Sequence, residues 1–65
     1  MKKLIPGRIW HPPNLPYNVR IKRATNGCEG CILDNLAVCP NILVKGENEE
    51  ERPHCELQEV IFVKP

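Results

Sequence analysis

The side chains best suited to chemistry in this chain of 65 residues are its four cysteines, Cys28, Cys31, Cys39 and Cys55. Two cysteines separated by two residues, as in the segment 28–31, place both sulfurs on one side of a tight turn, which is the geometry of half a zinc site. Gly27 and Gly30 favour such a turn because glycine accepts positive φ angles. Cys39 and Cys55 would supply the other two thiolates, and His54 is an alternative fourth ligand.

Zinc is the ion that this set of donors fits best. Four thiolates close a tetrahedral site and leave no position for water, so the expected zinc is structural rather than catalytic. Binding of such an ion contributes on the order of 10 kcal/mol to folding. An iron–sulfur cluster ranks below zinc, because the usual cysteine spacings of ferredoxins do not occur in the sequence.

Two other states are open to the same cysteines. As disulfides, the most economical of three connectivities joins Cys31 to Cys39 and Cys28 to Cys55. As reduced thiols, they would pack as small apolar side chains. Redox catalysis is disfavoured, because a redox C-x-x-C motif needs the N-terminus of a helix in a βαβ unit, and Glu29 between the thiols opposes a thiolate.

Other catalytic chemistry is not indicated by the sequence. It has no glycine-rich phosphate loop, no serine–histidine–aspartate ordering and no paired carboxylates in an apolar setting. His11, which precedes Pro12, is expected to lie on the surface or to pack. The sequence therefore predicts that the chain is not an enzyme, and a binding role becomes the leading hypothesis.

The elements that position the cysteines must belong to one small domain. A chain below about 70–80 residues rarely gains more than ~3–5 kcal/mol from its core, so small folds add a metal, disulfides or a partner. Seven prolines limit regular structure further. We expect a cysteine-stapled mini-domain, small α+β or mostly β, with short antiparallel strands, a C-x-x-C knuckle and a proline-rich N-terminal strap.

The strap spans residues 1–17, and a β-rich core with the four cysteines spans residues 18–65. Within the strap, Pro6–Gly7 predicts a turn between two short extended pieces. Three prolines between positions 12 and 16 favour extended geometry. The strap either covers the core or docks on another protein. If it docks, the side chains that bind the other protein would be the bulky ones of the strap: Trp10, Leu15 and Tyr17.

Two strands are expected in the core. Residues 18–24 alternate between apolar Val19 and Ile21 and basic side chains, which is typical of a half-buried strand. Residues 54–63 show the same period, with Glu59 breaking the pattern where a bulge or bend is expected. The apolar end of this second segment should be covered on both faces, or could pair with a second copy of the chain.

Shorter elements connect these strands. Asp34–Asn35 favours a tight hairpin between Cys31 and Cys39, and a one-turn helix capped by Asp34 is the alternative. Pro40 suits the first position of a short helix that ends near Lys45 and Gly46. Residues 47–53 are expected to form a solvated acidic loop.

Charge is divided unevenly along the chain. Residues 1–23 carry six cations and no acid, whereas residues 24–65 carry three cations and eight acids. The basic segment supports an alternative function, nucleic-acid binding, in which a base stacks on Tyr17 or Trp10 and the phosphates contact Arg20, Lys22 and Arg23. A near-neutral net charge of +1 and the acidic half oppose that function.

No apolar run approaches the length of a membrane span, and Pro6–Arg8 interrupt a signal-peptide pattern, so we expect a cytoplasmic protein. The series Cys28–Asn35, Cys39–Pro40, Cys55 and Val60–Lys64 resembles a group of small uncharacterised four-cysteine proteins of bacteria and their phages. The resemblance covers residues 27–64 and implies a bacterial or host cytoplasm. We expect an accessory module that binds another protein; a purely structural component is a further alternative.

Overall fold

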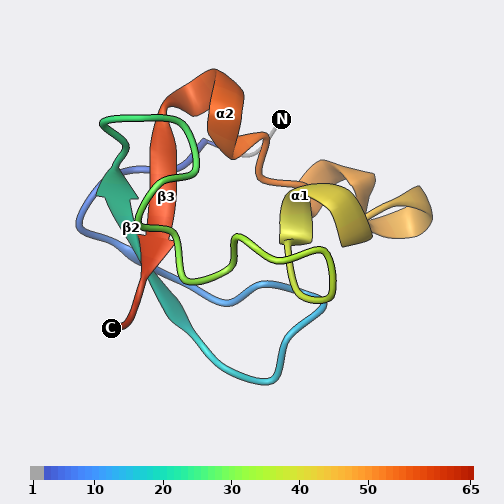
Figure 1. Ribbon diagram of the computed structural model, residues 1–65. Helices are drawn as coiled ribbons and strands as arrows, with labels where there is room; N and C mark the ends of the chain where they lie inside the picture. The colour runs from blue at the N-terminus through green and yellow to red at the C-terminus, as the bar shows by residue number, and fades with distance from the viewer. Residues whose placement is uncertain (1–2) are drawn as a thin grey trace.

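A three-stranded antiparallel sheet organises the chain, with strand order β1-β2-β3 (Figure 1). The strands are β1 (Ile9–Trp10), β2 (Val19–Arg23) and β3 (Val60–Val63). This computed structural model describes residues 3–65, apart from the side chain of residue 48. The sheet and the short helices that follow it make the fold a small α+β domain.

The central strand β2 has the alternation that its sequence predicts. Val19 and Ile21 are buried, while Arg20 and Lys22 are exposed on the other face. Ile21 lies opposite Phe62 of β3 in the register of the sheet, so the apolar side chains of both strands point into the same core. A period of two placed the buried face of β2 correctly because one face of this strand meets the core and the other meets water.

The N-terminal segment joins the sheet through the predicted turn. The Arg8 amide donates to the carbonyl of Ile5 at 3.1 Å, and Gly7 takes a φ of +93°, which few residues other than glycine adopt. The Gly7 amide then donates to the carbonyl of Ile21 at 2.7 Å. This turn therefore fixes the start of the chain against β2.

The proline-rich strap packs across the core. The Trp10 side chain is 7% exposed, and its ring centroid lies 5.1 Å from that of Phe62. Leu15 is partly buried against the same core, and Tyr17 remains 44% exposed. The side-chain amide of Asn14 donates to the carbonyl of Val38 at 3.1 Å, which ties the strap to the segment that contains the cysteines.

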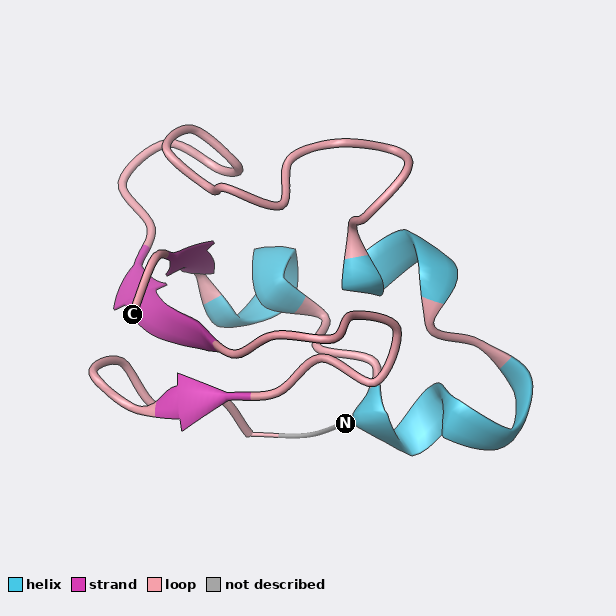
Figure 2. Cartoon of the chain, turned by 90° about the horizontal axis from the view of Figure 1, so that it is seen from below, coloured by secondary structure: helices cyan, strands magenta, loops and turns pink. Residues whose placement is uncertain are grey.

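Three short helical segments lie between β2 and β3: α1 (Pro40–Leu43), the 3₁₀-helix η1 (Gly46–Glu51) and α2 (Cys55–Gln58). Pro40 occupies the first turn of α1, as predicted. Residues 46–51, part of the expected acidic loop, form η1 instead. Figures 1 and 2 place α1 and η1 at the end of the molecule away from the sheet, whereas α2 leads directly into β3. Among residues 3–65, no helix has the length and apolar character to cross a membrane.

The hairpin expected between Cys31 and Cys39 does not form. Asn35 directs a helical turn there, because its carbonyl accepts the amides of Val38 and Cys39 and its side chain accepts the amide of Ala37. Asn side chains favour such local bonds to the backbone over a strand ladder. The alternative prediction of a one-turn helix is closer to the structure, although the side chain that bonds to the backbone of the turn belongs to Asn35 and not to Asp34.

The strand expected over residues 54–63 is wrong in its first half. Residues 55–58 form one helical turn, and the strand begins only at Val60. Glu59 marks the change: its φ of +54° lies in the left-handed region and turns the chain from α2 into β3. The predicted bend at Glu59 is therefore confirmed, but as the boundary between two different elements.

The core lies between the inner face of the sheet, the strap and the segment that follows β2. Phe62, Leu33 and Val19 are its largest fully buried side chains apart from prolines. Cys55 belongs to this cluster, and Cys31 and Val38 pack against it from its border. Two of the four cysteines thus contact the core directly.

We expect Trp10→Ala to destabilise the fold by about 3 kcal/mol or more, because a buried indole in contact with Phe62 is lost. Tyr17→Ala, at an exposed position of the same strap, is the matched control and should change stability by less than about 0.5 kcal/mol. Urea denaturation followed by circular dichroism measures both. Equal midpoints for the two variants would show that the strap does not cover the core.

Candidate metal centre

Three of the four cysteines border one cavity of about 230 Å³. They come from three separate segments: Cys28 from the turn after β2, Cys39 from the start of α1 and Cys55 from α2. The carboxylates of Asp34 and Glu56 border the same cavity. All four cysteines of the chain have free thiols. Sulfur and carboxylate donors therefore face a shared space.

Cys28 lies in a tight turn that ends at Cys31. The Cys31 amide donates to the carbonyl of Cys28 at 3.1 Å, and Gly30 takes a φ of +85°. A Cβ atom at Gly30 would lie 3.5 Å from Cδ1 of Ile61, so the turn packs closely on β3. The Ile32 amide then donates to the carbonyl of Phe62 at 2.9 Å. These contacts hold the Cys28 turn at the outer side of β3.

Cys39 and Cys55 are brought together mainly through Asn41. The carbonyl of Asn41 accepts a 2.7 Å hydrogen bond from Nε of Arg52, and its side-chain oxygen accepts the amide of His54 at 3.1 Å. Asn41 belongs to α1, two residues after Cys39, and His54 directly precedes Cys55. Asn41 thus fixes the start of α2 beside the start of α1.

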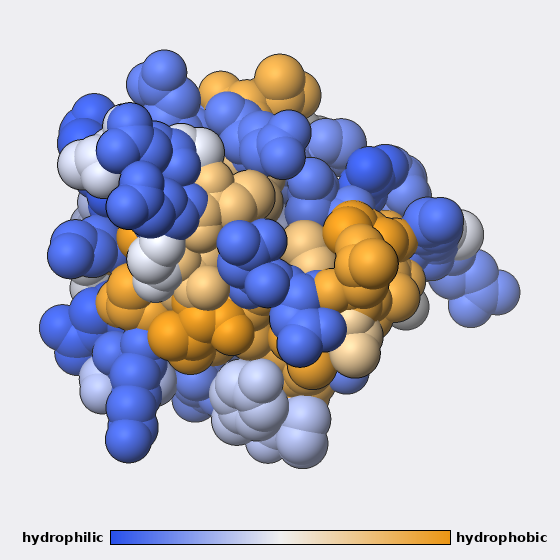
Figure 3. Space-filling model, viewed as in Figure 1, coloured by the Kyte–Doolittle hydropathy of each residue, from blue (hydrophilic) through white to orange (hydrophobic). Residues whose placement is uncertain are grey.

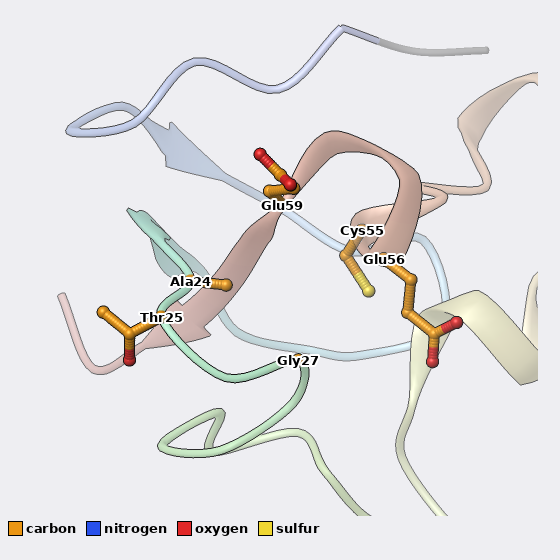
Figure 4. Close-up of a pocket in the computed structure, with 6 residues that line it drawn as sticks. All are labelled: Ala24, Thr25, Gly27, Cys55, Glu56 and Glu59. Atoms are coloured by element: carbon orange, nitrogen blue, oxygen red, sulfur yellow. The ribbon is translucent and has the colours of Figure 1, made fainter.

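Cys55 and Glu56 share the cavity because they lie on a helical turn. Figure 4 shows the sulfur of Cys55 and the carboxylate of Glu56 leaving α2 on one side, with Glu59 pointing away. The two side chains also line a second cavity, of about 420 Å³, beside Gly27. On the strand that the sequence predicts, they would have pointed to opposite faces.

Two of the predicted ligands lie elsewhere. Cys31 does not border the cavity that Cys28, Cys39 and Cys55 share, and it packs against the core. His54 is half-buried and does not line that cavity either, and its φ of +48° places the residue in the left-handed region at the start of α2.

Burial and nearby negative charge act on the thiols. Burial raises the pKa of Cys28, and the charges of Asp34 and Glu56 raise it further, ahead of those of Cys31 and Cys39. Burial raises the pKa of Cys55 from its ordinary value of 9.0 to about 11, and the other thiols add to this effect. The thiolates of Cys28 and Cys55 are therefore opposed by neighbouring negative charge, and a cation in the cavity would relieve that repulsion.

The donors surround the cavity without meeting at one point. Within residues 3–65, no three side chains of histidine, cysteine, aspartate or glutamate are grouped closely enough to hold a metal ion. Zinc–sulfur bonds are about 2.3 Å long, so binding would draw the thiols inward. Turns supply Cys28 and a one-turn helix supplies Cys55, and such elements adjust more easily than a sheet. The donor chemistry suits zinc, and inward movement of these segments is the step that binding requires.

Sequence reasoning missed Asn41 and Glu56. Asn41 gave no signal beyond its place after Cys39–Pro40. Glu56 lies next to Cys55, but the predicted strand assigned it to the opposite face. If Glu59 had been recognised as the end of a helix, Cys55 and Glu56 would have been placed on one helical turn, with both side chains on the same side of it.

The basic residues proposed for nucleic acid lie on and beside the sheet. Arg20, Lys22 and Arg23 are exposed. Among the described residues, none of the three has an ion pair or a side-chain hydrogen bond. Trp10 is buried and cannot stack a base in this conformation. Residues 1 and 2 of the basic segment lie outside the described part of the chain.

In the reduced, metal-free chain, stability should fall as Cys55 ionises. Its pKa in the fold is raised above the unfolded value, so this contribution is complete below pH 9 and is lost as the pH rises through about 11. The loss should reach roughly 2 kcal/mol. Denaturation at pH 8 and pH 11 measures it, and Cys55→Ala is the control that lacks the thiol. The same pH dependence in both chains would contradict the prediction.

Three thiols and two carboxylates, from Cys28, Cys39, Cys55, Asp34 and Glu56, border the cavity. Comparisons with protein-family models, curated proteins and solved structures found no match for this chain. The chemistry of the site therefore follows from its own donors. Thiolate and carboxylate ligands around one cavity suit a divalent, borderline-soft cation such as zinc.

Proposed function

We propose that this chain is a small non-enzymatic interaction module, fastened by a structural zinc ion, that binds another protein. The observation that carries the proposal is the shared cavity of Cys28, Cys39 and Cys55. A metal there would join the segment after β2 to α1 and α2. Protein ligands that fill the coordination sphere leave no position for substrate water.

The partner surface that we propose lies beside this cavity and consists of Leu36, Ile42 and Leu43, called here the α1 apolar surface. Leu36 is 77% exposed, and the other two are also exposed. Figure 3 shows apolar side chains gathered over α1, separated by hydrophilic side chains from those near the sheet. Exposed aliphatic groups that lie together mark interaction sites more often than those that lie singly.

Nucleic-acid binding is the second candidate, and the unpaired cations on the sheet favour it. Arg20 and Lys22 project from the outer face of β2 at alternate positions of the strand, and Arg23 is the next residue. Phosphate contacts by such side chains would give binding that weakens steeply with salt. The buried position of Trp10 weighs against base stacking, which makes this the less favoured function.

The cellular setting that we propose is the cytoplasm of a bacterium, or of a phage host. The support is the resemblance of residues 27–64 to small four-cysteine proteins of bacteria and phages. A reducing compartment keeps thiols available for a metal.

The metal is tested by the intact mass of the chain under native and denaturing conditions, before and after a chelator. The expected result is one zinc mass under native conditions that is lost on chelation, together with a large drop in melting temperature. A loss of four hydrogens would show two disulfides instead, and an unchanged mass in zinc-containing buffer would show reduced thiols. Either of these results contradicts the proposed zinc.

The partner class is tested by cross-linking the zinc-loaded chain in a bacterial lysate, with and without nuclease. The double variant Leu36→Ser, Leu43→Ser should lose the cross-linked protein, because it removes the α1 apolar surface. Arg20→Glu, Lys22→Glu is the matched variant and should keep it. If only the charge-reversed variant loses the cross-linked product, and if nuclease and salt also remove that product, the result would favour nucleic-acid binding and refute the protein-binding function.

A further inference from the structure

We propose that the carboxylate of Glu56, rather than the thiol of Cys31, supplies the fourth ligand of the metal site. The donor set would then be three thiolates and one carboxylate oxygen, from Cys28, Cys39, Cys55 and Glu56. This inference rests on the proposed zinc function and specifies its ligands. It differs from the set that the cysteine spacing predicts.

The first support is the position of Cys31. The side chains that line the shared cavity include Cys28, Cys39 and Cys55 but not Cys31. Cys31 packs with Leu15 and Val38 against the buried core. To reach the cavity, its sulfur would have to leave these apolar contacts, and the core would lose a group that fills space. Cys31 is only partly buried, but a free cysteine suits such a packing role because it behaves as a small apolar side chain.

The second support is the position of Glu56. Its Oε1 accepts a hydrogen bond from the Cys28 thiol at 3.9 Å, which joins the turn after β2 to α2 across the cavity. Glu56 follows Cys55 on the same helical turn, and Figure 4 shows both side chains extending toward one side. A metal that replaced the proton between Cys28 and Glu56 would keep both partners in place.

Asp34 also borders the cavity, but no hydrogen bond joins its carboxylate to a thiol among the described residues. Of the two carboxylates at the cavity, Glu56 is therefore the one in contact with a thiol.

A carboxylate in this position is chemically suitable for zinc. Zinc accepts aspartate and glutamate oxygen at about 2.0–2.2 Å as well as cysteine sulfur. Glu56 is exposed, so the oxygen side of the site faces solvent while the sulfur of Cys55 lies in the core. The ion would therefore enter and leave on the side of α2 that carries Glu56.

X-ray absorption of the zinc-loaded parent chain tests the donor set without any substitution. We expect three sulfur neighbours at about 2.3 Å and one oxygen or nitrogen neighbour at about 2.0–2.2 Å. Four sulfur neighbours would overturn the assignment of Glu56 while leaving the zinc function intact. A parent chain that binds no zinc would overturn both.

Substitutions then identify the oxygen donor. Glu56→Gln should weaken zinc binding at least about tenfold in competition with a chelator, and Asp34→Asn, the matched control, should weaken it less. In chains loaded with cobalt(II) in place of zinc, Cys31→Ala should retain the thiolate-to-cobalt charge-transfer intensity of the parent, whereas Cys39→Ser should lose about a third of it. Equal affinity of Glu56→Gln and the parent, or a loss of intensity in Cys31→Ala, would refute the proposal.

Discussion

Phe62 joins three parts of the chain that are far apart in sequence. Its side chain is 1% exposed, and its ring packs on Trp10 of the strap. Its backbone lies opposite Ile21 in the central strand, and its carbonyl accepts the amide of Ile32. The strap, the sheet and the segment that carries the cysteines therefore all depend on contacts with this one residue.

The cavity bordered by Cys28, Cys39 and Cys55 is attached to that framework at one side only. Cys55 belongs to the core cluster, and the Cys28 turn packs on β3 through Gly30. Cys39 is held less directly, through α1 and the hydrogen bonds of Asn41. A cation bound between them would link α1 to the core and to β3, and small domains often add a metal to a limited core.

The sequence predicted the elements whose pattern has one physical explanation. In β2, the alternation of Val19 and Ile21 with basic residues fits a half-buried strand and fits a helix poorly, and Pro6–Gly7 needs the turn that the structure contains. The region from residue 54 to 59 was ambiguous. Its period of two came partly from Leu57, which is 74% exposed and contributes nothing to the core.

The candidate site was predictable in its donor chemistry but not in its arrangement. Spacing identified the cysteines, yet spacing cannot separate a thiol that faces a cavity from one that packs in a core, as Cys28 and Cys31 show. That distinction depends on how turns of a few residues orient each side chain. Left-handed residues such as Glu59 decide those orientations, and glutamate gives no sequence signal for that conformation.

The pairing of β2 with β3 has a consequence for how the domain assembles. Residues 20–23 pair with residues 60–63, so the whole intervening segment, with every cysteine in it, is a loop that must close before β3 can join β2. Closing a long loop costs conformational entropy, and this cost slows folding. A cross-link between the Cys28 turn and Cys55 would bring the two strand ends together in advance, so ligation would speed sheet formation as well as strengthen the finished fold.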